Sequence, residues 1–286
     1  MAFPQTTSRD PDDCDTSDVY SGGTAVEGDQ LVSRTVLIAG NWKMHKTPDE
    51  AEHFVDKLLA RWTPALDVEL ALFPPFPALD RCGHRLRGSA IALGAQNVHH
   101  EPRGAFTGEV SCDMLVACGC RYVLVGHSER RHVFGEGDDT VCHKLHAVID
   151  TAGLSPVLCV GETLEERKRG DTQVRLGAQL ESALASLPQD DAAELVIAYE
   201  PVWAIGTGAN ATRNDAEEAC RWIRADLDRR FGRFIADTAR ILYGGSVNPD
   251  NAAELLRPAD VDGVLVGGAS LDTDSFLAIA AKAPGS

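Results

Sequence analysis

Short apolar runs alternate along the chain with longer stretches in which apolar residues recur at helical spacing. The runs are rich in Val, Leu, Ile and Ala and are bounded by polar residues, which is typical of strands buried on both faces. Eight such runs occur, at residues 35–41, 68–73, 90–96, 121–127, 155–161, 195–200, 240–245 and 263–268. The pattern therefore predicts eight buried strands.

The stretches between these runs predict helices. Residues 47–62, 138–153 and 212–231 carry apolar residues at helical spacing. Thr47 with Glu50 predicts a capping box at the start of the first helix, and Gly153 predicts the end of the second.

Strands that alternate with helices indicate βαβ units and a parallel sheet. Eight units within about 250 residues match a closed parallel (β/α)8 barrel of class α/β, built as a single domain over residues 34–286. An open doubly wound sheet is the alternative. That fold more often has a G-x-G-x-x-G turn after its first strand, and residues 39–45 (AGNWKMH) do not form one.

Residues 1–33 differ from the rest of the chain. They are acidic, rich in Ser and Gly and poor in apolar residues, which predicts a disordered extension. They lack the basic and hydrophobic regions of a secretory signal, and no apolar run approaches the ~20 residues that a membrane span requires. The eight cysteines form no paired C-x-x-C pattern, so we expect reduced thiols and a cytoplasmic protein.

Net charge narrows the range of partners. The formal charge is −16 at pH 7, which argues against binding to nucleic acid or to an acidic membrane surface.

Polar residues and glycines follow several predicted strands. The carboxyl ends of parallel barrel strands meet at one face, where active sites are built. The sequence therefore predicts one shared pocket, formed by Asn41, Lys43, His127, Glu200, Gly245, Ser246, Gly267 and Gly268.

Two of these residues suggest proton transfer. Glu200 fits a general base whose pKa desolvation raises from ~4.3 towards working pH, although it could instead be a surface acid. His127 precedes a predicted helix, whose N-terminus disfavours imidazolium, so a neutral ring could donate a hydrogen bond to a carbonyl. A structural role is the alternative for His127.

The other residues suggest an anionic substrate. Lys43 can supply positive charge in a chain that is otherwise acidic, unless it is a solvated lysine. The glycine-rich segments 243–246 and 266–270 close the last two units, where barrels commonly bind phosphate with backbone N–H groups. The set predicts proton transfer next to a carbonyl in a small phosphorylated substrate.

Five motifs carry a family resemblance. GNWKM (40–44), GHSERR (126–131), AYEPVWAIGTG (198–208), YGGSV (243–247) and GVLVGGASL (263–271) resemble the triosephosphate isomerase family, whose fold is the TIM barrel. The resemblance runs from about Val36 to Ala281. It implies an intramolecular aldose–ketose isomerase of glycolysis and gluconeogenesis that interconverts glycerone phosphate and D-glyceraldehyde 3-phosphate through an enediolate.

The resemblance also implies roles for single residues. Glu200 would move the proton between C1 and C2, while His127, Lys43 and Asn41 would polarise the carbonyl. Glu129 resembles a supporting carboxylate near the lysine. Neither a cofactor nor a metal is implied. The substrate would be bound by Asn41, Lys43, Gly206, Ser246, Gly267 and Gly268, and the last four would give backbone N–H groups to its phosphate.

Two loops are implied as well. The lid over the site would comprise Pro201, Val202, Trp203, Ala204, Ile205, Gly206, Thr207 and Gly208. Residues 97–111 resemble the loop that docks beside the partner's site in a homodimer, with an exposed Phe106 and with Thr107 reaching towards Asn41 and Lys43 of the partner subunit.

Departures and alternatives remain. His45 replaces an asparagine that the family usually has, and residues 209–212 lack the usual lysine of the lid hinge. His143 and His146 are three residues apart on a helix, but no further metal ligands accompany them. The alternatives are another phosphate-binding barrel, such as an aldolase or epimerase, and a barrel that has lost catalysis and serves as a binding protein.

Overall fold

The computed structural model of the chain describes residues 34–205 and 211–284. The predicted extension 1–33 and the predicted lid residues Gly206, Thr207 and Gly208 lie outside these ranges.

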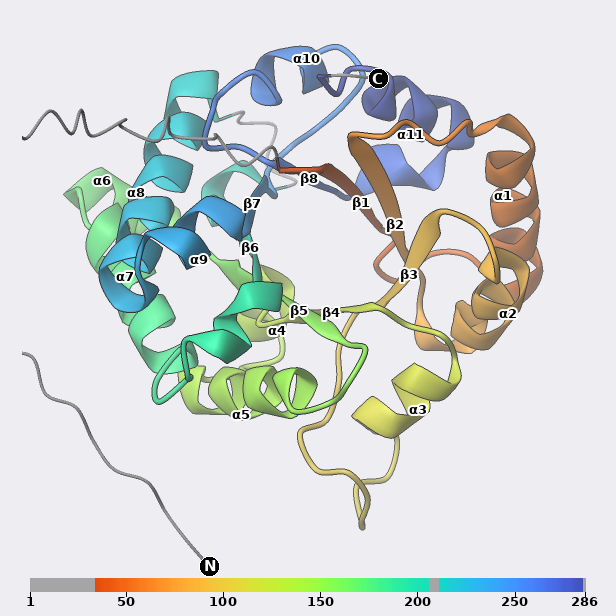
Figure 1. Ribbon diagram of the computed structural model, residues 1–286, viewed down its shortest axis with the longest axis horizontal. Coiled ribbons are helices and arrows are strands. Elements are labelled where there is room, and N and C mark those ends of the chain that lie inside the picture. Colours follow the sequence, from red (N-terminus) through yellow and green to blue (C-terminus); the bar gives the residue numbers. More distant parts are fainter. Residues whose placement is uncertain (1–33, 206–210, 285–286) are drawn as a thin grey trace, which may run out of the picture. The chain divides into compact units, whose positions relative to one another are not determined.

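Eight parallel strands form a closed barrel, in which each strand pairs with the next and β8 pairs with β1. The prediction of a single-domain (β/α)8 barrel is thereby confirmed. Figure 1 shows the strands at the centre of a ring of helices. The strands are β1 (Val36–Asn41), β2 (Val68–Phe73), β3 (Ile91–Ala95), β4 (Tyr122–Val125), β5 (Ser155–Val160), β6 (Val196–Tyr199), β7 (Arg240–Tyr243) and β8 (Gly263–Val266).

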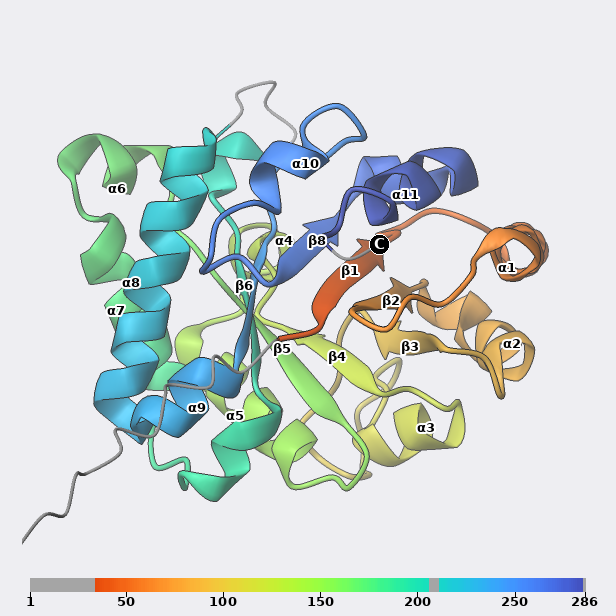
Figure 2. The same cartoon turned by 45° about the horizontal axis from the view of Figure 1, so that its top comes forward.

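Helices occupy the connections and surround the barrel, with α1 and α2 on the opposite side from α7 and α8 (Figure 2). The helices are α1 (Pro48–Arg61), α2 (Phe76–Leu86), α3 (Cys112–Ala117), α4 (Ser128–His132), α5 (Asp138–Ile149), α6 (Leu164–Arg169), α7 (Thr172–Ala183), α8 (Arg213–Phe231), α9 (Arg233–Thr238), α10 (Ala252–Leu255) and α11 (Thr273–Ala280). Short 3-10 helices are η1 (Asp190–Glu194), η2 (Val202–Ala204) and η3 (Gly268–Leu271).

Helix α1 illustrates how the sequence sets an element. Thr47 accepts a hydrogen bond from the Glu50 N–H, and the Glu50 side chain accepts one from the Thr47 N–H, so the predicted capping box is confirmed. Ala51, Phe54, Val55 and Leu58 lie on one face at helical spacing, and that face is buried.

The predicted end of α5 at Gly153 is wrong. The helix ends at Ile149, and Gly153 lies beyond it with φ of +88° in the turn before β5. The Thr151 hydroxyl donates to the Ala147 carbonyl at 2.7 Å and satisfies an acceptor of the last turn, so the helix ends there without a glycine cap.

The barrel interior is filled by side chains that alternate along each strand. Leu37 and Ala39 of β1, Val157 and Cys159 of β5, and Leu265 of β8 belong to this inner cluster. A second and larger apolar cluster lies between the strands and the surrounding helices. The barrel is therefore a packed core and not a pore.

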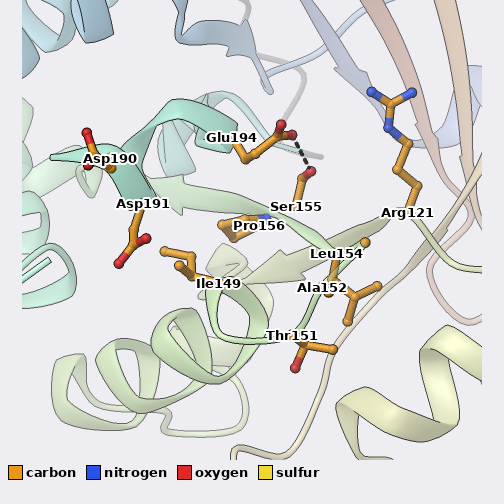
Figure 3. A pocket seen from close by; sticks show the side chains of 11 residues that line it. Arg121, Ile149, Thr151, Ala152, Leu154, Ser155, Pro156, Asp190, Asp191 and Glu194 are labelled. Carbon is orange, nitrogen blue, oxygen red and sulfur yellow. Dashed lines mark hydrogen bonds between the residues drawn. The ribbon is translucent and has the colours of Figure 1, made fainter. Parts of the chain in front are cut away.

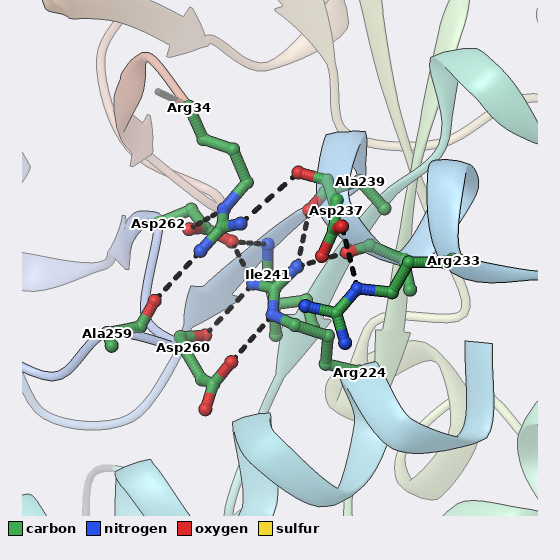
Figure 4. A network of polar contacts seen from close by, with 10 residues as sticks. Arg34, Arg224, Arg233, Asp237, Ala239, Ile241, Ala259, Asp260 and Asp262 are labelled. Carbon is green, nitrogen blue, oxygen red and sulfur yellow. Dashed lines mark hydrogen bonds and ion pairs between the residues drawn. The ribbon is translucent and has the colours of Figure 1, made fainter. Parts of the chain in front are cut away.

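Charged side chains close the amino-terminal end of the barrel. Glu69 of β2 accepts hydrogen bonds from the Tyr122 hydroxyl at 3.0 Å and from Arg240 of β7 at 2.6 Å. Beside them, Asp262 accepts from Arg34 through one oxygen and from Arg224 through the other, both at 2.5 Å (Figure 4). These networks join strands that are distant in the sequence.

A cavity of about 480 Å³ lies at the same end, next to the start of β5. Asp190, Asp191 and Glu194 of η1 face it, and the Ser155 hydroxyl donates to Glu194 at 3.0 Å (Figure 3).

Residues 96–111, between β3 and α3, project beyond the ring of helices (Figure 1). Phe106 is 43% exposed at this projection, as predicted. Among the described residues, no helix is long and apolar enough to cross a membrane.

Candidate active site

A cavity of about 410 Å³ opens at the carboxyl-terminal end of the barrel. Seven residues predicted for one site meet there, although they come from five different strand ends. The lining residues are Lys43, His127, Glu129, Glu200, Ile205, Gly244, Gly245, Ser246, Val247, Asn248, Leu265, Gly267, Gly268 and Ala269.

Glu200 follows β6 and is only 2% exposed. One carboxylate oxygen, Oε2, accepts the backbone N–H of Ser128 at 2.8 Å. The other, Oε1, lies 3.0 Å from Nε2 of His127. A buried carboxylate requires such partners, and these two fix its orientation towards the cavity.

Two glycines let the backbone approach Glu200 closely. A Cβ on Gly244 would lie 2.9 Å from Cγ of Glu200, and a Cβ on Gly161 would lie 1.8 Å from its carbonyl oxygen. Any larger residue at either position would displace the segment that carries the carboxylate.

His127 is the N-cap residue of α4, and its Nδ1 accepts the N–H of Glu129 at 3.2 Å. An acceptor Nδ1 carries no proton, so the neutral ring has its hydrogen on Nε2, which faces Glu200. The ring can therefore donate a hydrogen bond into the cavity while it remains uncharged.

The pKa of Glu200 differs in direction from the sequence-based expectation. Burial raises it, but His127, the Ser128 N–H and Lys43 stabilise the carboxylate and together hold the pKa below its ordinary value. The predicted raised pKa is wrong for this arrangement because it counted desolvation and omitted these donors. Burial lowers the pKa of His127, but the charges of Glu200 and Glu129 outweigh burial and raise it.

Lys43 is held in an uncommon backbone conformation, with φ of +53°. Its N–H donates to Oδ1 of Asn41 at 3.0 Å, and its carbonyl accepts from Nε2 of Gln96 at 2.9 Å. Its Nζ forms a 2.6 Å ion pair with Glu129. A left-handed residue other than glycine costs on the order of 1–3 kcal/mol and persists where its surroundings fix it, as Asn41, Gln96 and Glu129 do for Lys43.

The glycine-rich side of the cavity lies beside this lysine. A Cβ on Gly267 would be 3.5 Å from Cε of Lys43 and 3.9 Å from its Nζ. Gly267 is the N-cap residue of η3, which begins at Gly268, and Ser246 lines the same cavity. Positive charge and backbone groups thus adjoin each other where a phosphate was predicted.

Several predicted residues are not among the described residues that line this cavity, including Pro201, Val202, Trp203 and Ala204 of the predicted lid. Asn41 is buried at the end of β1 and holds the backbone of Lys43. Phe106 and Thr107 lie on the projecting loop, and Gly206 is outside the described residues.

The sequence analysis missed three supporting residues. Gln96 follows β3 and donates to the carbonyls of Lys43 and Phe73, and Glu162 follows β5 and accepts from Trp203 at 2.9 Å. Both follow strand ends, so the rule that found Glu200 would have found them too. Ser128 acts through its backbone N–H, for which the residue type gives no signal.

His143 and His146 have separate partners. The His143 ring packs near His100, with 5.3 Å between centroids, while Nε2 of His146 lies 3.1 Å from the Ala185 carbonyl oxygen. Within residues 34–205 and 211–284, no group of three or more His, Cys, Asp or Glu side chains could hold a metal ion.

Fold and site together define a class of protein: a parallel-barrel enzyme with a buried carboxylate, an imidazole and a lysine around one cavity of about 410 Å³. A profile of the family described as triosephosphate isomerase matches residues 36–283. The chain belongs to the triosephosphate isomerase family, and the prediction of an intramolecular aldose–ketose isomerase is confirmed.

Curated relatives agree over nearly their whole length. The chain is 54% identical to the triosephosphate isomerase of Carboxydothermus hydrogenoformans, across 86% of this chain and 98% of that protein. It is 50% identical to the protein of the same name from Symbiobacterium thermophilum, across 87% of this chain and 97% of that protein. The corresponding protein of Thermus thermophilus is 50% identical, across 86% and 98%.

Proposed function

We propose that Glu200 is the base that transfers a proton between C1 and C2 of a triose phosphate, interconverting glycerone phosphate and D-glyceraldehyde 3-phosphate. The observation that carries this proposal is the buried carboxylate 3.0 Å from Nε2 of His127. With its hydrogen on Nε2, His127 donates to the substrate oxygen on which negative charge develops in the enediolate. Lys43 adds positive charge beside the same cavity.

The phosphate is proposed to bind at Lys43, Ser246, Gly267 and Gly268, which line one side of the cavity. Glu129 supports this assignment, because its 2.6 Å ion pair sets the position of Nζ of Lys43. The lid remains a proposal for residues 201–208, and it is supported by Ile205, which also lines the cavity.

The test of Glu200 is the Glu200→Gln variant, which keeps the side-chain size and removes the base. We expect kcat to fall on the order of 10³-fold, within the range of general-base contributions. Wild-type protein should also incorporate deuterium from D2O into its product, and the variant should not. Glu194→Gln, which removes an exposed carboxylate at the other barrel end, is the matched control. Deuterium incorporation by Glu200→Gln at the wild-type rate would exclude Glu200 as the base.

We further propose a homodimer that works in the cytoplasm. The projecting residues 96–111 and the exposed apolar side chains of Met44 (94%), Phe106, Val133 and Phe134 support a self-association surface. Thr107 would contact Asn41 and Lys43 of the partner subunit. Sedimentation velocity should give a dimer, and Phe106→Asp should shift it towards monomer.

The described cysteines are free thiols, which suits a reducing compartment.

A further inference from the structure

Residues on both sides of Glu200 donate hydrogen bonds to one buried carboxylate, that of Glu162. Glu162, at the end of β5, is 0% exposed. Its Oε1 accepts the Tyr199 hydroxyl at 3.1 Å and Nε1 of Trp203 at 2.9 Å. Tyr199 precedes Glu200 by one residue and Trp203 follows it by three, so Glu162 holds the chain on both sides of the proposed base.

Arg167 is the cation that accompanies this carboxylate. Its Nη1 lies 3.5 Å from Oε1 of Glu162, and its guanidinium lies over the Trp203 ring, 4.8 Å from the centroid. A buried carboxylate is costly without a compensating charge, and a guanidinium over an indole adds cation–π attraction. Arg167 therefore acts on Glu162 and on Trp203 together.

The same guanidinium reaches the start of α8. Its Nη2 forms an ion pair with Asp215. Asp215 also accepts the N–H and the hydroxyl of Thr212, each at 2.8 Å, and so caps that helix. Arg167 thus joins described residues on both sides of positions 206–210.

We propose that Arg167 is a positioning residue for Glu200, holding Glu162, Trp203 and Asp215 in one arrangement so that the base keeps its place at the cavity. The inference rests on the proposed role of Glu200 as the base. The planar guanidinium of Arg167 meets Glu162 through Nη1 and Asp215 through Nη2, a fixed fork that the shorter, single-centred ammonium of a lysine would reproduce less well.

The test compares Arg167→Gln and Arg167→Lys with wild-type protein. For Arg167→Gln we expect kcat to fall between about 10-fold and 100-fold, as for a misplacement of about 1 Å. KM should stay within about threefold, because the interaction acts on the reacting geometry more than on substrate binding. Arg167→Lys keeps the charge and should recover part of kcat.

Asp215→Asn tests the connection to α8, since it keeps the capping oxygen and removes the charge. Its effect should not add to that of Arg167→Gln in the double variant, because both break the same contact. Arg230→Gln is the matched control, since Arg230 also bridges two carboxylates, Glu181 and Asp226, but far from the site.

Two results would overturn the proposal. One is wild-type kcat in folded Arg167→Gln. The other is a loss of kcat in Arg167→Gln that is fully explained by a smaller folded fraction, measured by circular dichroism and Tm, and that is as large as the loss in Arg230→Gln. Glu200→Gln, assayed in parallel, shows which of the two proposals has failed. If Glu200→Gln has wild-type kcat, the proposed base is wrong. If Glu200→Gln is inactive but Arg167→Gln has wild-type kcat, only the positioning role of Arg167 is wrong.

Discussion

Both ends of the barrel concentrate charged side chains, but they balance the charges differently. At the amino-terminal end, Asp262 is bound by Arg34 and Arg224, which remain charged at any physiological pH. At the carboxyl-terminal end, Glu200 is bound by a backbone N–H and by His127, whose ring can gain or lose a proton near neutrality. One carboxylate is permanently neutralised, whereas the other faces an exchangeable proton.

The volume of the cavity at each end of the barrel does not show which end carries the active site. The cavities measure about 480 Å³ and about 410 Å³. The acids at the first, Asp190, Asp191 and Glu194, are exposed to solvent, whereas Glu200 at the second is buried. A site for proton transfer is therefore recognised by a buried acid beside a titratable partner. Variants at each end should separate stability from catalysis.

The largest effect is expected at the amino-terminal network. Asp262→Ala leaves Arg34 and Arg224 without their shared carboxylate, so the free energy of unfolding should fall by about 3–5 kcal/mol. Urea unfolding measures the loss, and kcat per folded molecule should remain at the wild-type value. Arg61→Gln breaks an exposed pair with Asp274 and should cost less than about 1 kcal/mol. A large fall in kcat for folded Asp262→Ala would show that the two ends are coupled.

The second-largest effect is expected at the carboxyl-terminal end, where a substitution should lower kcat and leave stability nearly unchanged. Glu200→Asp withdraws the carboxylate by one methylene, and kcat should fall on the order of 10²-fold. Tm should change little, because the charge and its partners remain. Glu194→Asp makes the same shortening at the amino-terminal cavity and should leave kcat unchanged. Near-normal turnover in Glu200→Asp would contradict the role of this carboxylate.

The third effect concerns pH. Because His127 helps to hold the pKa of Glu200 below its ordinary value of 4.5, wild-type Glu200 stays ionised to lower pH than a free glutamate. His127→Gln removes that stabilisation while burial remains, so the pKa of Glu200 should rise. The 13C chemical shift of the Glu200 carboxylate, followed by NMR against pH, should then change at a higher pH in His127→Gln than in wild-type protein. This signal separates Glu200 from the substrate phosphate, whose second pKa is about 6, and from His127, which is present only in wild-type protein. An equal midpoint in the two proteins would show that His127 does not stabilise the carboxylate.

The smallest effect is expected from removing residues 1–33, which lie outside the described residues. Their sequence contains too few apolar residues to contribute much to a core. We expect Tm and kcat/KM to match those of the full chain. A Tm lower by several degrees would instead indicate that the extension packs on the barrel.

Much of the fold was predictable because buried parallel strands leave a clear apolar signal. All eight strands occur within the predicted runs, from β1 at Val36–Asn41 to β8 at Gly263–Val266. The site was predictable in outline because strand ends of a parallel barrel converge, which placed Lys43, His127 and Glu200 together.

The remainder depended on distances that a sequence does not contain. The direction of the pKa shift of Glu200 follows from the Ser128 N–H at 2.8 Å and from Nε2 of His127 at 3.0 Å. The importance of Gly244 follows from its approach to Cγ of Glu200 across two neighbouring strands. The end of α5 was misplaced because the helix stops at Ile149, four residues before Gly153, and the Thr151 hydroxyl satisfies the Ala147 carbonyl there without a glycine cap.

The filled barrel interior determines the route by which substrate, product and water enter and leave the cavity. Leu265 belongs to the inner cluster and also lines the catalytic cavity, so the packed core is the floor of that cavity. Substrate and product must then pass through the same opening, in either direction of the reaction. Bulk water can likewise reach Glu200 only through this opening, so a ligand seated there slows the exchange of a proton on the proposed base with solvent. The floor therefore limits this exchange without abolishing it, and part of the product should carry deuterium when the reaction runs in D2O.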